Sequence, residues 1–152
     1  MAAVAKIFVS MERQDVTLHR SGLAPLVFPV STSAVGSGFA ENSGGTPTGR
    51  FRIAAKIGEG LPPGTIFRGR VPVGIWHPGD TTAGDLILAR ILWLDGLDPA
   101  NANTLMRYIY FHGTNQEHLI GRPASLGCIR LRNADMITLF DLVAVDDRVE
   151  IG

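Results

Sequence analysis

One cysteine and one histidine stand out as residues that could carry chemistry together. Cys128, the single cysteine of the chain, ends the turn Ser125-Leu126-Gly127-Cys128, and His112 lies sixteen positions earlier, at the end of a predicted strand. Gly127 allows a sharp turn and close approach to a substrate, and the Gly127 and Cys128 amides could face a developing oxyanion. A thiol served by an imidazole is a nucleophile with its general base. The alternative is a small buried hydrophobe, the usual fate of a free cysteine.

Arginines dominate the charge around this cysteine. Between positions 107 and 132 the only acid is Glu117, against four arginines: Arg107, Arg122, Arg130 and Arg132. We expect this positive excess to lower the pKa of the thiol and to attract a substrate that bears a carboxylate.

The elements that must position these residues are mostly strands. Alternating or β-branched segments between Gly and Pro predict strands at 7–10, 15–20, 26–31, 51–57, 66–70, 85–94, 108–112 and 148–151, with long loops at 33–49 and 77–85. One helix is predicted near the end, with Asn133 as N-cap and an apolar stripe of Met136, Ile137, Phe140 and Val143. The prediction is a single domain over 1–152, mostly β: a β-sandwich or open barrel of mixed sheets with one or two short helices.

The composition of the chain disfavours several classes of function. The 152 residues carry 14 basic and 14 acidic side chains, so no overall field favours nucleic acid or a membrane surface. A single cysteine excludes an intramolecular disulfide. The first ten residues have no basic segment before a long apolar one, which is not the pattern of a signal peptide, and no segment is apolar enough for a membrane helix. We therefore expect a cytoplasmic protein, or a periplasmic one if a leader has been removed.

Two other kinds of site are disfavoured. Gly44 and Gly49 have the spacing of a phosphate-binding loop, but Arg50-Phe51 replaces its Lys and Ser/Thr. The histidines His19, His77 and His118 do not combine with Cys128 at zinc-site spacing. We expect no metal and no cofactor.

The residues from "HGTN" through "IGRPASLGCIRLRN" closely resemble the signature of the L,D-transpeptidase catalytic domain, the YkuD-type family. That pattern is a His-Gly, a gap of this size, then Ser/Thr-His-Gly-Cys and an Arg two residues after the Cys. The upstream segment "FPVSTS…GGTPTGRFRI" is similar to the family's strand, loop and Thr-Pro-x-Gly turn, so the resemblance extends over residues 6–151. Sortases also order His, Cys and Arg along a β-rich chain, but not at this spacing.

The resemblance implies a role for each matching residue. Cys128 is the nucleophile, His112 the general base, and the Gly113 carbonyl orients the imidazole. The Gly127 and Cys128 amides form the oxyanion hole. Arg130 holds a substrate carboxylate or braces the site, and Ser125 and Asn115 support substrate binding.

Leu126 departs from the pattern, because the family usually has a second histidine immediately before Gly-Cys. The family's base is the earlier histidine, matched here by His112, so the departure bears on the rate and electrostatics of the site more than on the reaction class.

The resemblance implies acyl transfer on peptidoglycan stem peptides at the bond between a diamino acid and D-Ala, through a thioester, with carbapenems as possible inhibitors. We expect hydrolysis of muropeptides, an L,D-carboxypeptidase activity of wall recycling. The alternatives are an L,D-transpeptidase that forms cross-links and a non-catalytic peptide-binding relative.

Overall fold

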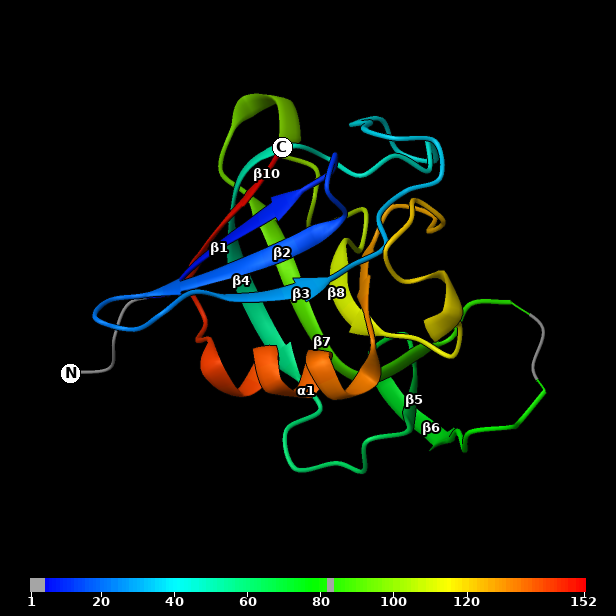
Figure 1. Cartoon of the computed structure of the whole chain (residues 1–152). Coiled ribbons are helices and arrows are strands. Elements are labelled where there is room, and N and C mark those ends of the chain that lie inside the picture. The colour runs from blue at the N-terminus through cyan, green and yellow to red at the C-terminus, as the bar shows by residue number, and fades with distance from the viewer. Residues whose placement is uncertain (1–4, 82–83) are drawn as a thin grey trace.

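The computed structural model describes residues 5–81 and 84–152, which form one continuous, curled sheet with a single α-helix (Figure 1). The strands are β1 (Ala5–Ser10), β2 (Asp15–Arg20), β3 (Leu26–Pro29), β4 (Gly49–Ile57), β5 (Thr65–Arg68), β6 (Val71–Ile75), β7 (Ile87–Gly96), β8 (Tyr110–Gly113), β9 (Ile129–Leu131) and β10 (Arg148–Ile151). The helix is α1 (Asn133–Leu142), and two short 3-10 helices span Pro99–Asn101 and Glu117–Leu119. The predicted mostly-β class is confirmed.

The two ends of the described chain lie side by side in this sheet. β1 pairs in parallel with β10, and the order across the sheet is β3-β2-β1-β10-β4-β7-β5-β6. Ile7 and Val9 are buried while Lys6 is exposed, and the same alternation holds in β10. This period of two buries one face of each strand in the main core.

β7 is the branch point that positions the functional region. It pairs with β4 and β5 and also with β8, which in turn pairs in parallel with the short β9. The pairing with β8 contains an irregularity between Leu88 and Ile91, where Ala89 has a positive φ of 70°. Prediction from the sequence finds β7 and β8, but it misses β6, a short strand that contains Pro72 and Gly74, and β9, which has only three residues.

The helix α1 packs against β7 and β8 (Figure 1). Its buried stripe is Met136, Leu139 and Phe140, followed by Val143, so the predicted member Ile137 is only partly buried. The prediction of Asn133 as N-cap is wrong. Arg132 holds that position without a side-chain cap, and Glu117 Oε2 instead accepts a hydrogen bond from the Asn133 amide at 2.8 Å.

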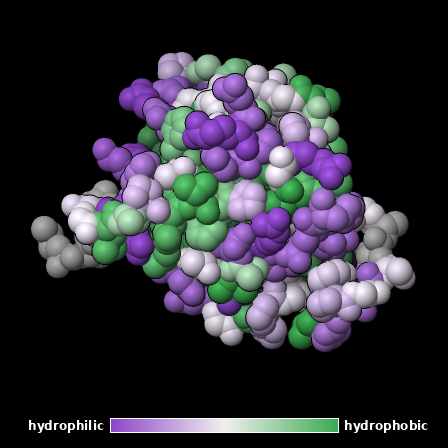
Figure 2. All heavy atoms as spheres, in the orientation of Figure 1, coloured by the Kyte–Doolittle hydropathy of each residue, from purple (hydrophilic) through white to green (hydrophobic). Residues whose placement is uncertain are grey.

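The two predicted loops are present, although residues 82–83 of the second lie outside the described part of the chain. The first, 33–49, is joined to the turn before Cys128 by a bridge from Ser33 to Ser125, and Ser31, just before the loop, bridges to Arg130 on β9. Hydrophilic and hydrophobic residues are interspersed over the face seen in Figure 2. Within residues 5–81 and 84–152, no helix has the length and apolar character needed to cross a membrane.

Candidate active site

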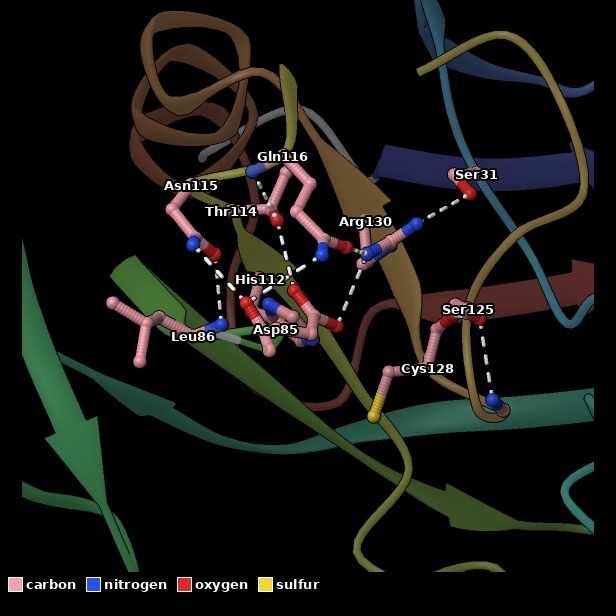
Figure 3. A network of polar contacts seen from close by, with 12 residues as sticks. Ser31, Asp85, Leu86, His112, Thr114, Asn115, Gln116, Ser125, Cys128 and Arg130 are labelled. Atoms are coloured by element: carbon pink, nitrogen blue, oxygen red, sulfur yellow. Dashed lines mark hydrogen bonds and ion pairs between the residues drawn. The ribbon is translucent and has the colours of Figure 1, made fainter. Parts of the chain in front are cut away.

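The parallel pairing of β8 with β9 brings the predicted nucleophile and base together. His112 is in register with Arg130, and Cys128 lies two residues before Arg130. Because side chains two apart along an extended chain share a face, Cys128, Arg130 and His112 face the same side of this pair (Figure 3). The sixteen-residue connection thus returns the chain to the strand beside its starting point.

The thiol of Cys128 is held by backbone groups at the entry to β8. Its sulfur donates to the Tyr108 carbonyl at 3.4 Å and accepts from the Tyr110 amide at 3.4 Å. Tyr108 has a positive φ of 57°, which directs its carbonyl away from the regular strand path. The sulfur is half-buried, and its resting hydrogen bonds are those of a protonated thiol.

The imidazole of His112 has a defined tautomer. Its side chain is buried, and Nδ1 lies 2.5 Å from the carbonyl oxygen of Gly113. Because a carbonyl only accepts, Nδ1 carries the proton and Nε2 keeps its lone pair for a proton from elsewhere. Gly113 is required by packing: a Cβ there would meet Asn133 Oδ1 and the Leu88 carbonyl oxygen.

Arg130 is at the centre of a buried polar network (Figure 3). Its side chain is fully buried, and Nη1 lies 3.1 Å from Asp85 Oδ2 and 2.7 Å from Gln116 Oε1. Nη2 donates to Ser31 Oγ at 3.1 Å. Of the two roles expected for Arg130, this geometry matches the bracing one, because its charge is directed at protein groups.

Ser125 and Gly127 shape the turn that presents the thiol. Ser125 Oγ donates to the Cys128 carbonyl at 2.7 Å and accepts from the Gly127 amide at 3.2 Å. Gly127 has a φ of 130°, and a Cβ there would lie 3.2 Å from the Gly45 carbonyl oxygen, so the turn needs glycine. Leu126, by contrast, is 84% exposed.

Asn115 lies on the other side of the network. Its Oδ1 accepts from the Leu86 amide at 2.8 Å and its Nδ2 donates to the Gly84 carbonyl at 3.1 Å. Asn115 therefore fastens the segment before β7 beside His112.

Burial sets the protonation of Cys128 and His112. Burial raises the pKa of the Cys128 thiol to about 11, against the lowering effects of the Tyr110 amide, Arg107 and Arg130. Arg107 and Arg130 lower this pKa as expected, but the predicted net lowering is wrong, because desolvation of the thiolate outweighs the arginines. Burial also lowers the pKa of His112, opposed by Asp85 and by the Gly113 carbonyl. At neutral pH the resting pair is a thiol beside a neutral imidazole.

Comparison with known proteins shows the family of this chain. The family model described as the L,D-transpeptidase catalytic domain, YkuD, matches residues 5–151. The chain belongs to the L,D-transpeptidase catalytic domain family. The probable L,D-transpeptidase ErfK/SrfK of Salmonella typhimurium is 53% identical over 45 residues, which cover 30% of this chain and 15% of that protein.

Solved structures share the fold of this L,D-transpeptidase domain at low sequence identity. An L,D-transpeptidase from Mycobacterium smegmatis superposes with a TM-score of 0.64 at 16% identity, covering 99% of this chain and 59% of that one. L,D-transpeptidase 3 from Mycobacterium tuberculosis, in complex with a faropenem-derived adduct, gives 0.63 at 17% identity, covering 98% and 60%. The chain spans about three-fifths of the length of these two structures.

The sequence assigns no individual site role to three residues beside the site: Asp85, Thr46, which it includes only as part of a turn, and Arg107, which it counts only for its charge. Asp85 precedes β7, and nothing in the sequence shows that β7 lies beside β8. Thr46, in the Thr-Pro-x-Gly turn, donates to the Gly127 carbonyl at 2.9 Å and so ties that turn to the nucleophile. Arg107 Nη2 donates to the Gly45 carbonyl at 2.8 Å. Among the described residues, no group of three or more His, Cys, Asp or Glu is arranged to hold a metal ion.

Proposed function

We propose that this protein is a cysteine-dependent acyltransferase of peptidoglycan stem peptides, acting at the bond between a diamino acid and the following D-Ala. The observation that carries the proposal is the site itself. Cys128 and His112 share one face of β8 and β9, and the Gly113 carbonyl holds the Nδ1 proton so that Nε2 serves as base. Membership of the L,D-transpeptidase family supports the proposed substrate class.

In the acylation half-reaction, the Cys128 sulfur attacks the carbonyl carbon of the scissile amide and its proton passes to His112 Nε2. The tetrahedral oxyanion then collapses, the carbon–nitrogen bond breaks, and His112 returns the proton to the leaving amine. In the second half-reaction an acceptor attacks the thioester, its proton passes to His112, and the sulfur leaves and is reprotonated.

Because the resting pair is neutral, proton transfer accompanies attack instead of preceding it. A preformed thiolate is disfavoured by burial, which raises the pKa of the thiol to about 11 and lowers that of His112. The imidazolium forms when the sulfur attacks and loses its proton when the leaving amine departs.

The turn at Cys128 supplies the groups for the oxyanion. The Gly127 amide donates to Ser125 Oγ over a long 3.2 Å contact, so a charged oxyanion competes well for it. We assign the Gly127 and Cys128 amides to this role, Ser125 to holding the turn, Asn115 to holding the segment before β7, and Arg130 to bracing.

The acceptor decides the product. Water gives an L,D-carboxypeptidase, the activity expected from the sequence, and the amine of a second stem peptide gives a cross-link. The test incubates wild type and Cys128→Ala with a disaccharide-tetrapeptide ending in D-Ala and follows the products by mass spectrometry.

Loss of one D-Ala with the wild type alone supports the hydrolase, whereas a dimer, or exchange of D-Ala for an added D-amino acid, supports the transpeptidase. Equal lack of turnover by both proteins contradicts the proposal and favours a non-catalytic, peptide-binding relative.

A further inference from the structure

The carboxylate of Asp85 is fixed on both oxygens beside the nucleophile and base. Oδ1 accepts from Thr114 Oγ1 at 2.9 Å, and Oδ2 lies 3.1 Å from Arg130 Nη1. Thr114 follows β8 directly and Arg130 lies on β9, so the two strands that carry the site also hold this carboxylate. Figure 3 shows Asp85 next to His112, with Arg130 on its other side.

Asp85 affects His112 by charge and not by a hydrogen bond to the ring proton, because Nδ1 already bonds to the Gly113 carbonyl. The charged groups that act on the imidazole are Asp85 and Arg130. The Cys128 thiol faces the same side of the β8–β9 pair. Burial lowers the pKa of His112 most, Asp85 raises it, and Arg130 lowers it less than Asp85 raises it. The carboxylate therefore offsets part of the cost of placing a positive charge on a buried ring.

We propose that Asp85 is a positioning residue of the reaction: its carboxylate, anchored by Arg130 and Thr114, stabilises the positive charge that His112 acquires when it takes the thiol proton. This inference rests on the function proposed above. Asp85 thus supplies from a separate segment the acidic partner that the His-Gly pair itself does not include.

The same carboxylate has the opposite consequence for the free thiol. Its negative charge disfavours the thiolate and adds to the raised pKa of Cys128. Removing the charge should make the thiol more acidic, and hence more reactive toward a small alkylating agent at a fixed pH. Turnover, which needs a basic His112, should fall. A residue that only held the fold together would not move these two rates in opposite directions.

The test compares Asp85→Asn with wild type and with Asp80→Asn, a matched control in the same segment whose carboxylate bonds to the His77 amide. For Asp85→Asn we expect tetrapeptide turnover to fall about tenfold or more and iodoacetamide labelling of Cys128 at pH 8 to become faster. Asp80→Asn should match wild type in both rates. Asp85→Glu should recover part of the turnover, because it restores the charge.

A measurement without substrate separates this inference from the proposed function. The imidazole of His112, assigned in NMR spectra with a His112→Gln variant, should titrate at lower pH in Asp85→Asn than in wild type. If wild type turns over no stem peptide, the proposed function fails while this titration still decides the role of Asp85.

An unchanged His112 titration, or turnover and labelling that fall together, would overturn the inference.

Asp85→Asn leaves the Arg130 charge buried, so thermal unfolding should be recorded for each variant. Should it not fold, the double variant Asp85→Asn/Arg130→Gln removes both charges. Asp85 has a larger effect than Arg130 on the pKa of both His112 and Cys128. In the double variant, His112 should therefore also titrate at lower pH than in wild type, and Cys128 should also be labelled faster. The absence of both changes would overturn the inference.

Discussion

At Cys128 the cost of burying a negative charge outweighs the attraction of the arginines nearby. Arg107 and Arg130 lower the pKa of the thiol, as does the Tyr110 amide, yet burial raises it to about 11. A reactive cysteine is often recognised by a depressed pKa. In the proposed reaction a thiol with such a raised pKa depends on His112 to take its proton during attack, so His112 would be as necessary as the sulfur.

The rate of alkylation of Cys128 tests this directly. Because only the thiolate reacts, we predict that the iodoacetamide rate constant keeps rising through pH 9 and reaches half of its limiting value only near pH 11, the pKa of the Cys128 thiol. The measurement is labelling followed by intact-protein mass, with glutathione as an exposed reference. A plateau reached below pH 8 would contradict the neutral resting pair.

Leu126 lies on the turn before Cys128, where the family pattern has a histidine. Its side chain is 84% exposed on the turn, so the residue found there in the family pattern would also project into solvent. We predict that Leu126→His changes the free energy of unfolding by less than about 0.5 kcal/mol and turnover by less than about tenfold. A larger gain in turnover, measured beside Leu126→Gln as the uncharged control, would show that this position limits the rate.

The sequence shows the residues of the site better than their surroundings. Short motifs contain His112, Gly113 and Cys128, and their spacing can be recognised without knowledge of the fold. Asp85 could not be found in this way, since its importance comes from the pairing of β7 with β8, which no local pattern encodes. The raised pKa of the thiol was missed for a related reason: charge can be counted along a sequence, whereas burial depends on packing.

At the scale of elements, the 33–49 loop and the nucleophile turn behave as one unit. Thr46 is buried, donates to the Gly127 carbonyl at 2.9 Å and accepts from the Ser33 amide at 3.0 Å. The Thr-Pro-x-Gly turn is thereby fixed against the backbone that carries Cys128. The predicted long loop therefore supports the turn that carries Cys128.

Thr46→Val should therefore affect both stability and catalysis. The variant keeps the shape of the side chain but leaves the Gly127 carbonyl and the Ser33 amide without this partner, at a cost of about 1–3 kcal/mol in the free energy of unfolding. We also predict lower turnover, because the turn loses its anchor. Urea unfolding and product assays should show much smaller changes for Thr138→Val, whose hydroxyl lies on the exposed side of α1. Equal effects of the two variants would contradict the anchoring role.

Prediction of the elements fails where the local sequence competes with tertiary contacts. β9 has only three residues and is stabilised by its parallel pairing with β8, so no periodicity reveals it. Asn133 has the side chain of an N-cap, but it donates to the Thr114 carbonyl at 3.0 Å while Glu117 bonds to its amide. β7, with its β-branched and aromatic residues, was predictable because its composition and burial agree.

At the scale of the whole molecule, the pairing of β1 with β10 closes the described chain into one sheet, and the site lies on the branch formed by β8 and β9. Folding this arrangement desolvates the Cys128 thiol, which links the stability of the molecule to the titration of that thiol.

This link predicts a pH dependence of stability. The unfolded chain loses the thiol proton near the ordinary pKa of 9.0, whereas the folded chain holds it until about pH 11. The contribution of Cys128 to stability is therefore complete below pH 9 and is lost as the pH rises toward 11. The Tm of wild type should fall more steeply with pH over this range than the Tm of Cys128→Ala. Parallel curves would contradict a raised pKa in the folded state.

The central claim, that Cys128 becomes acylated with His112 as its base, is tested most directly by the mass of the intact protein after exposure to a carbapenem. We predict that wild type forms a covalent adduct and that peptide mapping places it on Cys128. Hydroxylamine should release the adduct, as expected of a thioester. Cys128→Ala should form no adduct, and His112→Gln should form it far more slowly. An adduct that persists in Cys128→Ala, or a wild-type protein that remains unmodified, would contradict the account.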